Sequence, residues 1–205
     1  MSTPEQADLH AFHAWLSAAC ERGPVPVLTG KNGDMDTVGS AVALAASHPN
    51  LMACGIHLGR TAKRVVEDLK APFRKIASER TTWPPSMGGI VIVDAAAPGQ
   101  VGVELPKGIP ICIIDHHATS DWTLGEGDIN LQWDVRATTQ IIDQYLLAFS
   151  PTTRSEVVRK MLLSGLITDT GRFRHADAGA FDSAHLLLKD STIDYASFLQ
   201  VIESE

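Results

Sequence analysis

Carboxylate and imidazole side chains follow three apolar stretches of the sequence, each typical of a buried strand. Asp34 and Asp36 come after VPVLTG, Asp94 ends GGIVIVD, and the triplet DHH at 115–117 follows IPICII. Because the carboxyl ends of parallel strands lie at one edge of a sheet, we expect these side chains to meet there. Carboxylates accompanied by imidazole suit Mn²⁺, Mg²⁺ or Fe²⁺. The spacing therefore predicts a divalent metal site.

A fourth acid follows a helical pattern, in the segment GLITDTGRF. Asp169 lies there in a tight polar turn. Several carboxylates close together cannot all stay ionised without compensation, and a divalent cation is the usual compensation. So many acids indicate two metals about 3.5–4 Å apart, the arrangement that clamps a phosphoryl group during in-line displacement. Asp94, which has no second acid beside it, is the expected bridging ligand.

Each acid also has an explanation that needs no metal. An aspartate after a strand is commonly a turn former or a helix N-cap, and Asp36 could simply cap the helix that it begins. The adjacent pair His116 and His117 is harder to explain in this way, because two imidazoles at the end of a buried strand have no packing reason to be there.

The turn after the fourth acid carries three candidate substrate-binding residues. Arg172 and Arg174 in GRFRH could bind a substrate phosphate through bidentate hydrogen bonds, or could be solvated. His175 follows them in the same turn. We keep all three as candidates for contact with an anionic substrate.

The surrounding pattern predicts a parallel sheet that brings the acids together. Short apolar runs bounded by Pro, Gly and polar residues indicate buried strands at 25–29, 51–58, 88–96 and 109–117. Helical patterns occupy 4–22, 36–47 and 61–70 between or before the strands, and after them roughly 135–149, 153–167, 178–189 and 191–203. This alternation predicts an α/β fold with a parallel β-sheet flanked by helices on both faces.

Composition and charge narrow the class of protein. The 205 residues are 44% hydrophobic and 20% charged, which is ordinary for a globular domain. The formal net charge of −7 disfavours long duplex DNA as a partner, so nucleic-acid binding would need a basic patch or metal ions. No internal repeat or domain linker is visible, and we expect a single domain over residues 1–205.

The cysteines and the N-terminus indicate the compartment. Cys20, Cys54 and Cys112 lack metal-binding spacing and two of them lie in apolar runs, so we expect buried free thiols in a reducing cytoplasm. The N-terminus has no basic segment leading into an apolar stretch, and no apolar stretch approaches the roughly 20 residues of a membrane helix. We therefore expect a soluble cytoplasmic protein with no membrane partner.

The four segments that carry the candidate residues resemble, in order, the motifs of the DHH-family phosphoesterases. NGDMDTVGS resembles the family's H-x-N-P-D-x-D-x-x-G-S, VIVDAA its strand-terminal aspartate, DHH its signature and GLITDTGRF its T-D-T-G-x-F. The resemblance covers residues 25–175. It implies a DHH-type catalytic domain of the oligoribonuclease, bisphosphonucleotide phosphatase and RecJ-like group, without the C-terminal substrate-binding domain that most members carry.

The resemblance also implies a role for each candidate. Asp34 and Asp94 would hold one Mn²⁺. The other Mn²⁺ would be held by Asp36, Asp94, His116 and Asp169. His117 would face the scissile phosphate, and Asp115 would orient His116 as its hydrogen-bond partner. A metal-activated water would then attack phosphorus.

One position departs from the family pattern. The family's first-motif histidine is expected at position 30, where this chain has Gly30 followed by Lys31. One metal would thereby lose its only imidazole, which should weaken its binding considerably, since even the loss of a supporting contact costs about 10–100-fold. Lys31 could neutralise charge or meet the substrate phosphate.

These features predict a Mn²⁺-dependent phosphoesterase that hydrolyses small nucleotides or short single-stranded oligonucleotides. Two metals are expected, one of them weak, with Mg²⁺ or Fe²⁺ as alternatives to Mn²⁺. The alternative function is a catalytically reduced relative that binds a nucleotide or a nucleic-acid-processing partner, as Gly30 would permit. The substrate and the oligomeric state stay open, with a homodimer among the assemblies considered.

Overall fold

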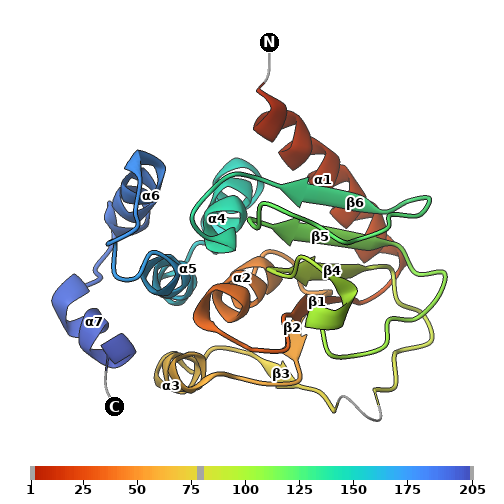
Figure 1. The fold of residues 1–205 in the computed structure, drawn as a ribbon, viewed down its shortest axis with the longest axis horizontal. Coiled ribbons are helices and arrows are strands. Elements are labelled where there is room, and N and C mark those ends of the chain that lie inside the picture. The colour runs from red at the N-terminus through yellow and green to blue at the C-terminus, as the bar shows by residue number, and fades with distance from the viewer. Residues whose placement is uncertain (1–2, 78–80, 204–205) are drawn as a thin grey trace.

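A computed structural model describes residues 3–77 and 81–203, which form one parallel sheet with α-helices (Figure 1). The sheet has six strands in the order β3-β2-β1-β4-β5-β6, and every neighbouring pair is parallel. The strands are β1 (Val25–Thr29), β2 (Leu51–Gly55), β3 (Arg74–Lys75), β4 (Ile90–Val93), β5 (Ile111–Asp115) and β6 (Ile129–Gln132). The predicted α/β class with a parallel sheet is confirmed.

The helices are arranged in layers beside the sheet. Figure 1 shows α2 and α4 next to the strands, α5 beyond them, and α6 and α7 outermost. The α-helices are α1 (Pro4–Arg22), α2 (Met35–Ala45), α3 (Arg60–Leu69), α4 (Thr138–Phe149), α5 (Glu156–Asp169), α6 (Ala178–Leu188) and α7 (Tyr195–Glu203). None of the helices in the described part of the chain is long and apolar enough to cross a membrane.

The strand order fixes where a ligand can bind. From β1 the chain moves to β2 and β3 on one side, whereas β4, β5 and β6 extend on the other side. The order therefore reverses between β1 and β4, and open parallel sheets bind ligands in the crevice outside the carboxyl ends of strands at such a point. Asp34 and Asp36 follow β1, and Asp94 follows β4 directly.

Side chains at the helix starts explain where most helices begin. Thr3 forms a capping box with Gln6 at the start of α1, and Asp34 and Ser155 accept backbone N–H groups at the starts of α2 and α5. The start of α4 differs, because its N-cap residue Ala137 makes no side-chain hydrogen bond. The partners of its first amide groups must come from elsewhere in the chain.

The two faces of the sheet are covered differently. One face packs with α1, α2, α4 and α5 in the main core, which includes the fully buried Phe12, Leu44 and Ile142. The other face presents residues such as Leu28 and Ile92 to connecting segments before and after β4. One of these segments joins β4 to β5. Its described residues contain turns and the 3₁₀ helix η2 (Pro98–Gln100) and no α-helix.

Two strands at the sheet edges are absent from the sequence-based expectations. β3 consists of the two exposed residues Arg74 and Lys75, and β6 (Ile129–Gln132) has four residues. Both are too short to display a recognisable alternation of apolar and polar residues. β6 matters for the site, because the chain leaving it leads directly into α4.

The three cysteines are buried and free, as predicted. Burial raises the pKa of the Cys54 thiol to about 12, although the nearby Arg74 charge acts in the opposite direction. A thiol in this state stays protonated at neutral pH and is a poor nucleophile or metal ligand. Carboxylates and imidazoles are therefore better candidates for metal ligands in this chain than Cys54.

Candidate metal centre

Four of the predicted metal ligands meet around one imidazole nitrogen. His116 Nε2 lies 3.3 Å from Asp169 Oδ2, 3.5 Å from Asp94 Oδ1 and 3.8 Å from Asp36 Oδ2. The ligand atoms of Asp36, His116 and Asp169 all lie within 4.8 Å of one another. The same holds for Asp94, His116 and His117. These side chains come from the ends of β4 and β5, the first turn of α2 and the end of α5, and they meet at one point.

Asp36 also completes the start of α4. Its carboxylate accepts the N–H of Thr138 at 2.7 Å and the N–H of Thr139 at 2.9 Å. These amides belong to a helix without a cap of its own, and the positive end of a helix favours an anion. Asp36 is fully buried and is held with Oδ2 near His116. It does not cap its own helix, because Asp34 occupies that position and accepts the N–H of Thr37 at 3.1 Å.

Asp94 lies at the end of β4 in an uncommon backbone conformation. Its φ of 57° is in the left-handed region, which residues other than glycine adopt at a cost of about 1–2 kcal/mol. Its Oδ1 accepts a hydrogen bond from the Thr138 hydroxyl at 3.3 Å and faces His116. Strained backbone of this kind concentrates at functional sites, where the rest of the structure holds it in place.

The charges in this cluster are not balanced. Burial, followed by the charges of Asp94 and Asp169, raises the pKa of Asp36 well above its usual value. Burial and the charge of Asp94 likewise raise the pKa of Asp34. Burial opposes the protonation of His116, but hydrogen bonds with Asp169 and Asp94 and the charge of Asp36 outweigh it and raise its pKa to about 11. One imidazolium compensates only part of several carboxylates, so the donor set fits a divalent cation.

The two histidines are oriented by different partners. His116 Nδ1 lies 3.3 Å from the carbonyl oxygen of Val135, to which it donates, so Nε2 is the ring nitrogen that could bind a metal. His117 Nδ1 lies 2.6 Å from Asp115 Oδ1. The expectation that Asp115 orients His116 is therefore wrong. Residues two apart on an extended chain point to the same side, which pairs Asp115 with His117.

An open cavity of about 280 Å³ gives access to the cluster. Its lining combines the loop after β1, one residue of η2 and the cluster itself: Gly30, Lys31, Asn32, Asp34, Asp94, Gln100, His116, His117 and Asp169. A Cβ atom at Gly30 would lie 3.0 Å from Asn32 Oδ1 and 3.3 Å from the carbonyl oxygen of Asp94. The amide of Asn32 also donates to Asp34 Oδ2 at 2.5 Å. The loop residues 30–34, which carry the Asp34 carboxylate into this lining, include no histidine.

The predicted substrate-binding residues are placed less favourably. Lys31 lines the cavity, but its Nζ donates to the carbonyl oxygen of Gly99 at 2.9 Å. Arg172 pairs with Glu203 of α7, with 2.6 Å between Nε and Oε1. Within the described part of the chain, Arg172, Arg174 and His175 are not lining residues of this cavity. Their contact with a substrate stays a prediction.

Two threonines that support the site were not predicted from the sequence. Thr37 Oγ1 accepts the N–H of Gly30 at 2.8 Å and donates to the carbonyl oxygen of Val93 at 3.0 Å, which joins the loop after β1 to the end of β4. Thr138 contacts both Asp36 and Asp94. A threonine at the start of a helix has many ordinary explanations, and nothing in the linear sequence shows which distant residues it will meet.

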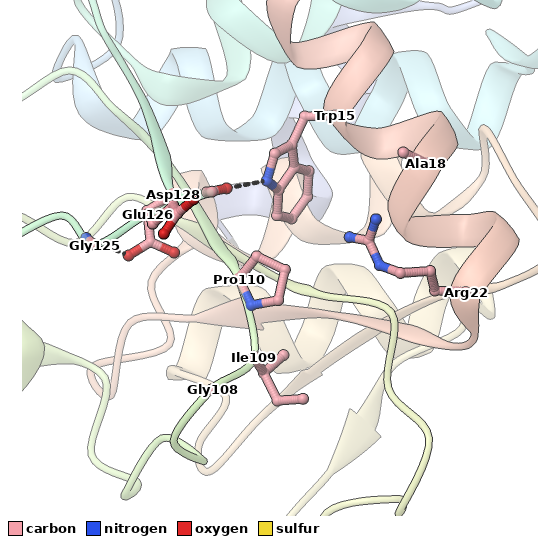
Figure 2. A pocket seen from close by; sticks show the side chains of 10 residues that line it. Trp15, Ala18, Arg22, Gly108, Ile109, Pro110, Gly125, Glu126 and Asp128 are labelled. Atoms are coloured by element: carbon pink, nitrogen blue, oxygen red, sulfur yellow. Dashed lines mark hydrogen bonds between the residues drawn. The ribbon is translucent and has the colours of Figure 1, made fainter.

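A wider cavity of about 510 Å³ lies where β5 and β6 begin, at the opposite end of the strands (Figure 2). The Nε1 atom of Trp15 donates there to the carbonyl oxygen of Gly127 at 2.8 Å. The Asp128 carboxylate accepts the N–H groups of Ile111 and Gly125, each at 2.7 Å. These polar groups already have protein partners, and the cavity has no comparable set of converging carboxylates among its lining residues.

A family model matches most of the chain. Residues 24–167 match the model of the DHH family, N-terminal domain. The uncharacterized protein MJ1633 of Methanocaldococcus jannaschii is 29% identical over 190 residues, which cover 90% of this chain and 38% of that protein. The chain thus spans well under half the length of this relative.

Two solved structures share the fold. An exopolyphosphatase-related protein from Bacteroides fragilis has a TM-score of 0.77 at 15% identity, with 98% of this chain and 61% of that chain covered. A protein of Methanococcus jannaschii described as a candidate family II inorganic pyrophosphatase has a TM-score of 0.69 at 21% identity, covering 86% and 60%. These structures share the fold, and because the family model matches most of the chain, the chain belongs to the DHH family.

Proposed function

We propose that the protein is a metal-dependent phosphoesterase that acts on small nucleotides or short single-stranded oligonucleotides. The observation that carries this proposal is the convergence of three carboxylates on His116 Nε2 at 3.3–3.8 Å. Membership of the DHH family supports phosphoryl chemistry, as do the descriptions of the structural neighbours as exopolyphosphatase-related and pyrophosphatase proteins.

The donor set suggests how metals would be held. One divalent cation would be bound by Asp36, Asp94, His116 and Asp169. A second would be bound by Asp34 together with Asp94. Carboxylates with a single imidazole favour Mn²⁺, Mg²⁺ or Fe²⁺, and we propose Mn²⁺. Such ions polarise a phosphoryl group and lower the pKa of a water molecule enough for attack at neutral pH.

The chain's own residues provide proton transfer and orientation. Asp115 is almost fully buried and fixes His117 through Nδ1, so the imidazole presents Nε2 from a half-exposed position beside Asp94. From there Nε2 can hold or release a proton at an oxygen of the substrate. Thr138 and the amides of α4 hold Asp94 and Asp36 in place, which keeps the ligand set organised before substrate arrives.

One observation favours a second candidate function. In the loop that carries Asp34, a Cβ atom at Gly30 would lie 3.0 Å from the side-chain oxygen of Asn32, and the loop residues 30–34 include no histidine. A weak second metal position would slow hydrolysis while leaving one metal and a nucleotide-binding cavity. The alternative is therefore a catalytically reduced relative that binds a nucleotide or a nucleic-acid-processing partner.

An assay with matched variants tests the proposal. The protein is loaded with Mn²⁺, its metal content is measured, and hydrolysis of pAp, short RNA and bis-p-nitrophenyl phosphate is followed. We expect turnover that is lost in Asp94→Ala and His116→Ala and kept in Asp128→Asn, which alters a carboxylate at the opposite end of the sheet. No metal uptake and no turnover would refute the proposal. One bound metal with nucleotide binding and no turnover would favour the alternative.

A further inference from the structure

A second cavity adjoins the metal centre at the histidine pair. It has a volume of about 400 Å³ and is lined by His116, His117, Ala118, Gln132, Trp133 and Asp134. His116 and His117 also line the cavity that contains the acid cluster. A ligand with its phosphate at the cluster could therefore extend past His117 into this second cavity. The end of β6 and the segment before α4 form the far wall.

Trp133 is held in a fixed orientation in this wall. Its indole Nε1 donates to Asp8 Oδ2 at 2.9 Å, and its backbone N–H donates to the carbonyl oxygen of Asp115 at 3.2 Å. The side chain is half-buried and packs against the main core. An aromatic ring anchored at its edge can stack with a planar group without first losing conformational freedom. Nucleobases are planar groups that stack on aromatic side chains in this way.

The polar groups of the cavity disfavour a polyanion. Asp134 is exposed, and its carboxylate has no hydrogen-bond or ion-pair partner within residues 3–77 and 81–203. The Gln132 side chain donates to the carbonyl oxygen of His117 at 2.5 Å and is already engaged. No lysine or arginine stands among the lining residues of the described structure. A free carboxylate repels phosphate and accepts hydrogen bonds from N–H donors.

We propose that the cavity of Trp133 and Asp134 binds the nucleoside part of the substrate. The inference rests on the proposed phosphoesterase function and names its substrate class: a nucleoside phosphate whose base carries an exocyclic amino group. The base would stack on Trp133 and donate its amino N–H to Asp134, while the phosphate lies at the acid cluster. Pyrophosphate and polyphosphate would place negative charge beside Asp134 and gain nothing from Trp133.

Binding of AMP in the presence of Mn²⁺, measured by calorimetry, tests this subsite without requiring turnover. We expect Trp133→Ala to weaken AMP binding about tenfold and Trp133→Phe to weaken it less, because phenylalanine keeps a stacking face. Binding of inorganic phosphate should be unchanged in both variants. Trp15→Ala, which removes an indole at the opposite end of the sheet, is the matched control and should leave AMP binding unchanged.

A second comparison tests the carboxylate. Wild-type protein should bind AMP more tightly than IMP, because IMP lacks the exocyclic amino group, and Asp134→Asn should reduce this preference. Asparagine preserves the size of the side chain, so a folding defect is not expected. Equal preference in wild type and Asp134→Asn would refute the role of Asp134.

The results separate this inference from the proposed function. AMP binding that depends on Trp133, without hydrolysis of pAp, would support the subsite and refute the hydrolytic proposal. Hydrolysis of pAp with the same KM in wild type and Trp133→Ala would support the hydrolytic proposal and refute the subsite. A Trp133→Ala variant that binds AMP as tightly as wild type, or that loses AMP and inorganic phosphate binding equally, would overturn the subsite.

Discussion

The two ends of the parallel sheet carry cavities of opposite character. At the amino end, the cavity of about 510 Å³ beside Trp15 is wider, but Asp128 in its wall accepts two backbone N–H groups (Figure 2). At the carboxyl end, the cavity has the smaller volume of about 280 Å³, but three carboxylates converge there on His116. Uncompensated charge therefore distinguishes the end at which we propose the metal site, whereas cavity volume does not.

The direction of the strands explains the contrast. At the carboxyl ends, the chain leaves β1, β4 and β5 through loops that carry Asp34, Asp94 and His116, and the strand order reverses between β1 and β4. The amino ends face segments that enter the sheet, where Asp128 and Trp15 hold turns and α1 in place. Side chains of the same chemical type thus serve structure at one end and are available for ligand binding at the other.

The largest expected effect comes from Asp94, which is close to His116 and is the proposed shared ligand. Asp94→Asn should lower hydrolysis about 10²–10³-fold and abolish the stabilisation by Mn²⁺, because a neutral amide no longer attracts the cation. The same change removes repulsion from the cluster, so the melting temperature of the metal-free protein should stay equal or rise. Calorimetric melting with and without Mn²⁺ measures both effects. A fall in metal-free stability with metal stabilisation retained would contradict the assignment.

The next effect is a dependence of metal binding on pH. His116 has a pKa raised from an ordinary 6.5 to about 11, so Mn²⁺ must displace its proton throughout the neutral range. Affinity for Mn²⁺ should therefore rise with pH, by up to about tenfold per unit. Titration at pH 6, 7 and 8 measures the slope, and an affinity that is flat or falls with pH would exclude His116 as a ligand.

The metal-free protein should respond to pH in the opposite sense. A raised folded-state pKa gives stability that is complete below the unfolded value and is lost as pH rises toward the folded value. The raised pKa values of His116, Asp34 and Asp36 all act in this direction. We expect the melting temperature of the chelator-treated protein to fall between pH 7 and 9 while the increment given by Mn²⁺ grows.

A smaller, favourable effect is expected at Gly30. Gly30→His should strengthen the second metal position about tenfold, because it adds an imidazole beside the Asp34 carboxylate. A Cβ at this position lies no closer than 3.0 Å to its nearest neighbour, the side-chain oxygen of Asn32, which can shift by a few tenths of an ångström. Gly30→Ala is the control, since it adds the same Cβ without a ligand. Equal metal stoichiometry and affinity in the two variants would show that the glycine does not limit the site.

The smallest effect on activity is expected at the amino end. Trp15→Ala should lower the free energy of unfolding by about 1–3 kcal/mol, because the half-buried indole and its hydrogen bond to Gly127 are lost. kcat/KM should stay within about twofold of wild type. Urea unfolding and a hydrolysis assay measure the two quantities. A large loss of activity in folded protein would contradict the claim that the amino end of the sheet serves structure alone.

Much of the site could be predicted from local sequence. Apolar runs followed by acids indicated a strand that ends shortly before Asp34 and another that ends at Asp94, and the rule that parallel strands present their carboxyl ends together predicted that Asp94 meets His116. The helix predicted over 4–22 agrees with α1, and the structure adds the capping box that Thr3 forms with Gln6 at its start. These features depend on neighbours within a few residues, so the linear sequence contains the information.

The remaining features depend on distant partners. Asp36 caps α4 through Thr138, which lies 102 residues further along the chain, and no local pattern signals that contact. The pairing of Asp115 with His117 became clear only from the direction of the side chains at the end of β5. The edge strands β3 and β6 are too short for periodicity, and they are defined by pairing with β2 and β5.

The central claim is that the acid cluster at the carboxyl end binds a divalent metal. Crystals of the protein soaked in Mn²⁺ and measured near the manganese absorption edge test it directly, because anomalous scattering locates the ion. We predict a peak within coordination distance of Asp36, Asp94, Asp169 and the Nε2 atom of His116. Well-ordered crystals with no anomalous peak among these four side chains, or with manganese bound only elsewhere, would contradict it.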